Sequence, residues 1–371
     1  MLSPQRSGSE PHDVHSTCTN SKRPYNFKEG GNIEMIIHDT SSQSEVLSSS
    51  RNRTLGTAAG IDPHKIRQLS AISPWRSGFH ISLEWATIVL AAEACKRFWN
   101  PILYLAVVAF IGARQHALLI LMHEGTHYRL FRNRRLNDWV SEVFLAWPHL
   151  TTMRSYRHNH VAHHQNLNTA GDPDWTRKKD EPDWQFPKQS WQMAVLFIKD
   201  LTGLGAISLI RVSRSLAAND PDKSPGFGRL RLAFYVMAVL MIAEFGALKS
   251  VLLFWLVPFS TWLILIMHIR SIAEHFAIDS ENPNSKTRTT VIGLAERIFI
   301  APKNVNYHSE HHSFPSVPFY RLPELHRLML ATEHYFDFTH LSRGYLAVLG
   351  ECRSEPLKCA GFAGLIREAS D

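Results

Sequence analysis

The stretch Pro101-Ile-Leu-Tyr-Leu-Ala-Val-Val-Ala-Phe-Ile-Gly-Ala-Arg-Gln-His-Ala-Leu-Leu-Ile-Leu-Met122, followed at once by His123-Glu-Gly-Thr-His127, decides the fold. Its apolar part carries only Arg114 and His116 as basic side chains. At a rise of about 1.5 Å per residue, about 20 such residues cross the hydrocarbon core of a bilayer. The sequence therefore predicts a membrane-spanning helix that ends in a pair of histidines.

Three more apolar segments, residues 81–95, 232–248 and 251–267, accompany this helix. The connections between them are short and polar, at 96–100 and at 249–250, and predict two helical hairpins. Four apolar segments in two hairpins fit a bilayer better than the alternative, a soluble helical protein with buried hairpins. We therefore predict an all-α integral membrane fold with four transmembrane helices in two hairpins.

The distribution of charge predicts the orientation. The chain has 371 residues and a net charge of +7, which is too modest to indicate a nucleic-acid partner. Basic residues gather before the first apolar segment and in 123–230, so both termini and this long loop are expected to be cytosolic, at the inner membrane if the source is bacterial. Residues 193–210 are amphipathic and interrupted by charges, and we expect them to lie in the membrane interface.

Composition along the chain predicts three regions. Residues 1–60 are polar and without period, and are expected to be disordered. Residues 75–345 form the membrane domain, and 346–371 a polar C-terminal tail. The four cysteines contain no C-x-x-C pair, which argues against a thiolate zinc site or a disulfide framework. With 21 histidines in the chain, histidine is the expected metal ligand.

The histidines occur in three spaced groups. The first has the spacing H-x3-H, and the other two share the spacing H-x2-H-H. On a helix, positions i, i+3 and i+4 lie on one face, so each group can direct its imidazoles at one point. A ninth histidine follows the fourth apolar segment. The predicted metal ligands are His123, His127, His160, His163, His164, His275, His308, His311 and His312.

Nine imidazoles are too many for one metal ion and suit two. Imidazole binds zinc, copper, iron and nickel, so ligand chemistry alone leaves the metal open. The zinc protease pattern H-E-x-x-H is absent, because His123-Glu124 continues to His127 with a different spacing. His268 is a weaker ligand candidate, and His116 is expected to be a packing residue.

The three groups and two hairpins resemble the membrane fatty acid desaturase superfamily. The segment Asn304-Val-Asn-Tyr-His308-Ser-Glu-His-His312-Ser-Phe-Pro315 is similar to the third histidine box of its bacterial and sphingolipid-type branches. Arg270-Ser-Ile-Ala-Glu274-His275 resembles the additional histidine element after the fourth helix. Ser271 stands where acyl-CoA members have an asparagine, so an asparagine-bound water is not expected.

The resemblance implies a cytosolic helical cap that holds a non-haem di-iron site, with the nine histidines as its ligands. It implies an oxidoreductase that uses dioxygen as co-substrate and introduces a C=C bond into a fatty acyl or lipid-like chain. No His-Pro-Gly-Gly element is present, so electrons are expected from a separate ferredoxin-type or cytochrome b5-type carrier. Residues expected to orient the ligands are the carboxylates Glu124, Asp172, Asp174, Glu274 and Glu310.

Other functions stay open at this stage. The chain could desaturate a small secondary metabolite, such as an amino-acid enol ether of the dihydrorhizobitoxine type. It could also be a hydroxylase or ketolase of the same superfamily, because both reactions begin with hydrogen abstraction. A remote alternative is a non-enzymatic membrane protein that binds or transports metal. Four aromatic residues beside the third box are candidates for a substrate-channel wall: Phe299, Phe314, Phe319 and Tyr320.

Overall fold

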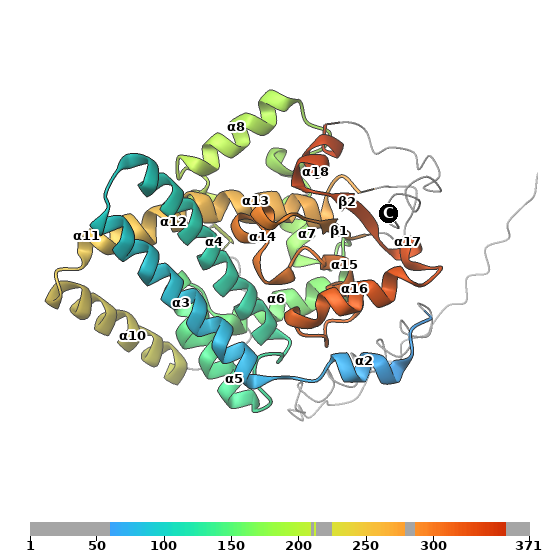
Figure 1. Cartoon of the computed structure of the whole chain (residues 1–371), viewed down its shortest axis with the longest axis horizontal. Helices are drawn as coiled ribbons and strands as arrows, with labels where there is room; N and C mark the ends of the chain where they lie inside the picture. The colour runs from blue at the N-terminus through green and yellow to red at the C-terminus, as the bar shows by residue number, and fades with distance from the viewer. Residues whose placement is uncertain (1–59, 209–210, 213–224, 279–285, 354–371) are drawn as a thin grey trace, which may run out of the picture. The chain divides into compact units, whose positions relative to one another are not determined.

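The computed structural model describes residues 60–208, 211–212, 225–278 and 286–353. The predicted disordered segment 1–60 therefore lies almost wholly outside the described residues. The described part is mostly helical (Figure 1). In chain order its first elements are α2 (Pro63–Leu69), α3 (Pro74–Arg97), α4 (Pro101–Thr126), α5 (Arg134–Val140), the π-helical turn η1 (Ser141–Ala146), the 3-10 turn η2 (Trp147–His149), α6 (Met153–Asn166), α7 (Pro173–Lys178), η3 (Pro182–Trp184) and α8 (Ser190–Leu201).

The remaining elements include α13, which ends at His275, and α15, which carries the third histidine group. They are α10 (Pro225–Glu244), α11 (Leu248–Val251), the π-helical η4 (Leu252–Leu256), α12 (Val257–Ser260), α13 (Trp262–His275), β1 (Arg288–Val291), α14 (Leu294–Phe299), η5 (Pro302–Asn304), α15 (His308–Ser313), η6 (Phe319–Arg321), α16 (Leu322–Leu330), α17 (Tyr335–Phe338), β2 (His340–Arg343) and α18 (Tyr345–Glu351).

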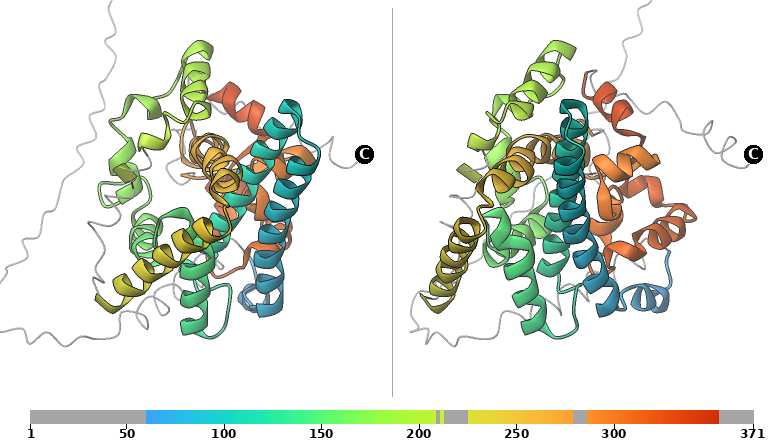
Figure 2. Two further views of the ribbon diagram at one scale, coloured as in Figure 1. Left: turned by 90° about the vertical axis from the view of Figure 1, so that its left-hand side faces the viewer. Right: turned by 60° about the vertical axis from the view of Figure 1, so that its left-hand side comes forward.

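Helix α4 begins where the sequence gives both a proline and a cap. The Asn100 side chain accepts a hydrogen bond from Leu103 N at 2.8 Å, and Pro101 occupies the first turn, where its missing N–H costs nothing. The helix is buried along most of its second half and packs side by side with α3 (Figure 2). α4 is therefore a largely buried helix, and the first histidine pair lies at its C-terminal end.

Two helical runs are long and apolar enough to cross a membrane: α4 and the continuous run Leu248–His275, which comprises α11 to α13. The other two predicted spans form helices as well, α3 and α10. The second hairpin turns earlier than expected, because α10 ends at Glu244 and Gly246 adopts a positive φ of 58°. Left-handed backbone of this kind favours glycine, which the sequence supplies three residues before the expected turn.

The all-α prediction is wrong in one detail. Strands β1 and β2 pair in parallel over four residues each, from Arg288 opposite His340 to Val291 opposite Arg343. The two β-branched threonines of β1 are buried and suit a strand. The predicted tail also begins with a helix, since α18 occupies residues 345–351 and buries Val348.

A buried ion cluster fastens the segment before the third histidine group to the long helices. Glu84 of α3 lies 3.3 Å from Arg114 Nη1 of α4 and 2.5 Å from Lys303 Nζ of η5. The Glu84 side chain is 2% exposed, so each charge depends on its partners for solvation. The cluster thereby joins the consecutive helices α3 and α4 to η5, which lies far along the chain and precedes the third histidine group.

Candidate metal centre

The first histidine pair lies at the C-terminal end of α4. His123 occupies the last turn, and His127 is the residue that ends the helix. The carbonyls of this end are bound by Arg157 of α6, whose Nη2 donates to Gly125 O at 2.9 Å and whose Nε donates to Thr126 O at 3.1 Å. Arg157 thus connects the helix of the first box to the helix of the second.

The other histidines come from three separate elements. Helix α6 supplies the second box, α15 supplies the third, and the last residue of α13 is His275. The nine side chains meet in the interior. Six are buried, and the other three, His123, His127 and His312, are half-buried. All nine histidines predicted from the sequence are thus brought together, whereas their role as ligands stays a prediction.

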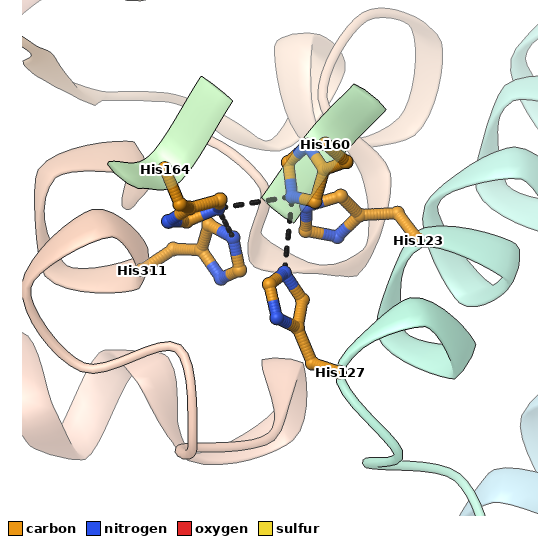
Figure 3. Close-up of side chains that lie close together, drawn as sticks. All are labelled: His123, His127, His160, His164 and His311. Carbon is orange, nitrogen blue, oxygen red and sulfur yellow. Dashed lines mark hydrogen bonds between the residues drawn. The ribbon is translucent and has the colours of Figure 1, made fainter. Parts of the chain in front are cut away.

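The cluster divides into two adjacent groups. The larger group holds His123, His127, His160, His164 and His311, whose ligand atoms lie within 4.8 Å of one another (Figure 3). The second group contains three histidines, His163, His275 and His312, and the overlapping set Glu274, His275 and His308 extends it. The two groups touch where the ring of His164 stacks on that of His312, with 4.1 Å between centroids.

The spacing between nitrogen atoms fits a metal ion. His160 Nε2 lies 3.0 Å from His127 Nε2 and 2.9 Å from His164 Nε2, and His164 Nε2 lies 3.1 Å from His311 Nε2 (Figure 3). Ligands at right angles around a metal with bonds of about 2.1 Å are separated by about 3 Å. In the second group, His308 Nε2 and His275 Nε2 lie 2.9 Å apart.

One imidazole in the second group also has an unused donor atom. The Nε2 of His312 is buried and has no hydrogen-bond partner within the described ranges. A buried polar atom without a partner is costly, and a metal ion would remove that cost. The donor set therefore fits one ion in each group.

Burial keeps the imidazoles in the form that binds metal. Desolvation lowers the pKa of His160 and His164 well below 6.5, and neighbouring histidines add to the shift. Burial lowers the pKa of His311 to about 3. All three are therefore neutral at pH 7, as a metal ligand must be.

Two of the five predicted carboxylates contact the histidines of the second group. Asp172 Oδ2 lies 2.8 Å from His163 Nδ1, and Glu274 Oε1 lies 3.6 Å from His308 Nδ1. Burial raises the pKa of Asp172, but the bond to His163 outweighs it and holds this pKa below the usual range. Asp172 therefore stays ionised and fixes the orientation and tautomer of the His163 ring.

The other three carboxylates have different partners. Glu124 accepts from Phe319 N at 2.9 Å and also lies 3.8 Å from Nδ1 of His123 in the larger group. Asp174 pairs with Lys178 at 2.6 Å. Glu310 binds three residues that no sequence pattern indicated. His326 Nδ1 lies 2.6 Å from its Oε1, Tyr335 OH donates to the same oxygen at 2.7 Å, and Thr289 Oγ1 donates to Oε2 at 2.5 Å.

His268 and His116 lie outside both groups. His268 Nδ1 is 3.0 Å from Asp200 Oδ2, and its ring packs on Trp184. His116 accepts a hydrogen bond from Arg270 Nη1 at 2.7 Å. Neither is therefore positioned as a ligand.

The four predicted wall residues do not form one surface. Phe299 packs on Phe110, and Phe314 lies in the cluster of α2 and α16. Phe319 and Tyr320 pack against the α3–α4 core. The aromatic residues beside the third box therefore occupy three separate packing environments.

Comparison with known proteins agrees with this site. The sequence model of the family described as fatty acid desaturase matches residues 99–343, which include all nine histidines. The dihydrorhizobitoxine desaturase of Bradyrhizobium elkanii is 26% identical over 293 residues, covering 72% of this chain and 80% of that protein. The sphingolipid delta(4)-desaturase/C4-monooxygenase of Homo sapiens is 28% identical over 286 residues, covering 72% of this chain and 79% of that protein. Because this family model matches more than half of the chain, the chain belongs to the fatty acid desaturase family.

Proposed function

We propose that this protein is an oxygen-dependent desaturase with one non-haem iron in each histidine group. The observation that carries the proposal is the convergence of nine imidazoles into two touching groups in a member of this family. When bound, iron would supply the chemistry that reduces dioxygen and removes hydrogen from an unactivated C–H bond.

The protein's own residues have defined parts in this proposal. The five histidines of the larger group would hold one iron, and His163, His275, His308 and His312 the other. Asp172 keeps the His163 ring in one orientation. The surrounding helices exclude water from the cluster, which protects reactive species from side reactions. Electrons come from a separate carrier of the ferredoxin or cytochrome b5 type.

The substrate we propose first is a fatty acyl or lipid-like chain. The human relative's name includes both a sphingolipid desaturase and a C4-monooxygenase, so hydroxylation is the neighbouring reaction. The bacterial relative's name supports a second candidate, desaturation of a small secondary metabolite. Overall, the substrate loses two hydrogens and dioxygen accepts them, together with two electrons and two protons, to give an alkene and two waters.

We also propose that the chain spans the membrane four times, with the histidine cap and both termini in the cytosol. Besides the two long apolar runs, α3 and α10 support this because both expose large apolar side chains. Examples are Val89 and Leu90 on α3, and Val239 and Leu240 on α10. Exposed apolar surface of this extent indicates contact with lipid or protein.

Metal analysis and isotope labelling test the proposal. Purified wild-type protein should contain about two irons per chain, one for each group. His164→Ala should lose iron and turnover, whereas His334→Ala, which changes an exposed histidine, should keep both. Under ¹⁸O₂, the main product should be an unlabelled alkene. Label retained in the main product as a hydroxyl or ketone would make the protein a hydroxylase or ketolase, and full activity of His164→Ala would refute the metal site.

A further inference from the structure

The place of His275 in the second histidine group depends on how helix α13 ends. His275 is the last residue of that helix, and its Nε2 lies 2.9 Å from Nε2 of His308. Two residues later the backbone passes through Ala277, whose φ of 49° lies in the left-handed region that alanine rarely adopts. The last carbonyls of a helix have no partner within it, so other groups must bind them.

One buried guanidinium binds the carbonyls on both sides of His275. Nη1 of Arg288, in β1, donates to Ala273 O at 2.7 Å and to Phe276 O at 3.1 Å. Its Nη2 donates to Ala277 O at 2.6 Å. The Arg288 side chain is fully buried, and a positive charge is favourable at the C-terminal end of a helix. A single side chain of β1 therefore holds the end of α13, including its left-handed turn.

Glu351 holds this guanidinium in place. Arg288 Nη2 donates to Glu351 Oε2 at 2.9 Å, so the N–H groups of both Nη atoms are used. His340 Nε2 lies 2.9 Å from the same carboxylate oxygen, and Ser342 Oγ donates to Oε1 at 2.7 Å. A buried arginine needs a counter-charge, which Glu351 supplies. Arg288, Glu351 and the three carbonyls together are called the α13 anchor below.

Apolar packing holds α18, which carries Glu351, in the same region. Tyr345 and Val348 of α18 and the following Cys352 are buried in one cluster with Ile272 and Ala273 of α13. Residues 345–351 lie beyond the range 99–343 that the family model matches. The α13 anchor is therefore built partly from a segment outside the part of the chain that identifies the family.

We propose that Arg288 and Glu351 position His275 for the second metal ion, so that α18 supports the metal centre of this protein. This inference rests on the proposed function and deepens it, because it assigns positioning residues to one of the two metal groups. The larger group takes its histidines from α4, α6 and α15 and none from α13. Loss of the α13 anchor should therefore weaken the second ion and spare the first.

Titration of the full chain in detergent with ferrous iron, in the absence of oxygen, tests this selectivity. The metal-free wild type should bind about two irons per chain, one for each group. Glu351→Gln removes the counter-charge of Arg288 and keeps nearly the same side-chain size. It should bind the second iron about tenfold or more weakly in competition with a chelator, because supporting residues of metal ligands contribute about 10–100-fold.

Arg288→Lys provides a second variant of the same anchor. Lysine keeps the positive charge, but its three N–H groups on one nitrogen cannot reach four acceptors spread around a guanidinium. This variant should therefore weaken the second iron as Glu351→Gln does. Two tightly bound irons in both variants would overturn the proposal.

Two control variants separate positioning from folding. Glu324→Gln breaks an exposed ion pair with Lys65 and should still bind both irons. Leu69→Ala removes a buried side chain from the cluster of α2 and α16, so it should lower the melting temperature and also keep both irons. Loss of both irons in Glu351→Gln, or selective loss of the second iron in Leu69→Ala, would show general instability and overturn the proposal.

Hydrogen exchange of the metal-free protein, measured by mass spectrometry, tests the α13 anchor without iron. Amides of residues 272–276 should exchange at least about tenfold faster in Glu351→Gln and Arg288→Lys than in the wild type, and amides of residues 120–126 should not change. Unchanged exchange with both irons kept would refute the anchor and leave the di-iron function. Faster exchange at 272–276, in a protein whose wild type never binds iron, would support the anchor and refute the di-iron function.

Discussion

Asp172 combines two structural roles in one carboxylate. Its Oδ1 accepts from Asp174 N at 2.8 Å and from Trp175 N at 3.2 Å, which caps α7. Its Oδ2 accepts from Asn168 N at 3.0 Å and pairs with His163 Nδ1. The start of the charged helix α7 and the orientation of a predicted metal ligand thus depend on the same residue.

Asp172→Asn should lower metal affinity without unfolding α7. Asparagine caps helices about as well as aspartate, so the cap is kept. The neutral amide no longer stabilises His163 as a donor, and outer partners of this kind are worth about 10–100-fold in metal affinity or activity. Competition with a chelator should show a loss in this range. Asp180→Asn, an exposed change on the following turn, should show none, and an equal effect of both would contradict the role of Asp172.

The neutral histidines predict how stability depends on pH. In the unfolded chain they take up protons near pH 6.5, whereas burial lowers the pKa of His311 to about 3 when folded. Below pH 6.5 the unfolded state therefore binds more protons, and stability is lost as the pH falls. Each such histidine costs about 2 kcal/mol at pH 5.

The melting temperature of the metal-free protein should accordingly fall from pH 7 to pH 5. His311→Gln should show a shallower decline, because one titrating group has been removed. His334→Gln, at an exposed site, should follow the wild type. A melting temperature that is the same at pH 7 and pH 5 would show that the cluster does not exclude protons.

For individual residues, the sequence predicted which histidines lie together, but not which of the two groups each histidine joins. The spacings i, i+3 and i+4 place box-two residues on one face of α6, and this much follows from helix geometry. That His164 joins His127 while its neighbour His163 joins His275 depends on where α4 and α13 place their histidines in the folded chain. The partners of Glu310 were missed for the same reason, since they are distant in sequence and follow no period.

Gly112 offers a sharp test of packing at the scale of the helix. Gly112→Ala should destabilise the protein by about 1–3 kcal/mol, because the new Cβ would meet Trp262 and the backbone N of Leu263. The matched control is Gly78→Ala in α3, where nothing lies within 4 Å of the new Cβ. It should be neutral or stabilising by about 0.5–1 kcal/mol, from helix propensity alone. Denaturation curves measure both, and equal curves would mean that the helices are not in contact.

The helices themselves were largely predictable, and their interruptions were not. The run from Pro101 predicts α4 because the apolar stretch, the cap and the proline all agree. The π-helical turns η1 and η4 leave no comparable signal in the sequence. Strand β1 was missed because its four residues are too few to show alternation, and its partner β2 lies far along the chain.

At the scale of the whole molecule, the proposed membrane topology can be tested by labelling single cysteines. In a cysteine-free background, Trp99→Cys and Phe245→Cys mark the two hairpin connections, and Ala170→Cys marks the histidine side. Labelling with a membrane-impermeant maleimide should modify the two connections from one face of the membrane and position 170 only from the other. Modification of all three from the same face would exclude four spans in two hairpins.

The pairing of β1 with β2 sets the order of events during synthesis. Thr289 and Thr290 of β1 hold the third-box segment, through Glu310 and through the bond from Thr290 N to Asn306 O. β1 is in turn held by β2, which includes residues His340–Arg343. The ribosome therefore synthesises the first two boxes long before it synthesises β2, which holds the third-box segment through β1. We expect metal to be loaded after translation, and a chain interrupted just before His340 to present every histidine of the cluster without keeping it assembled.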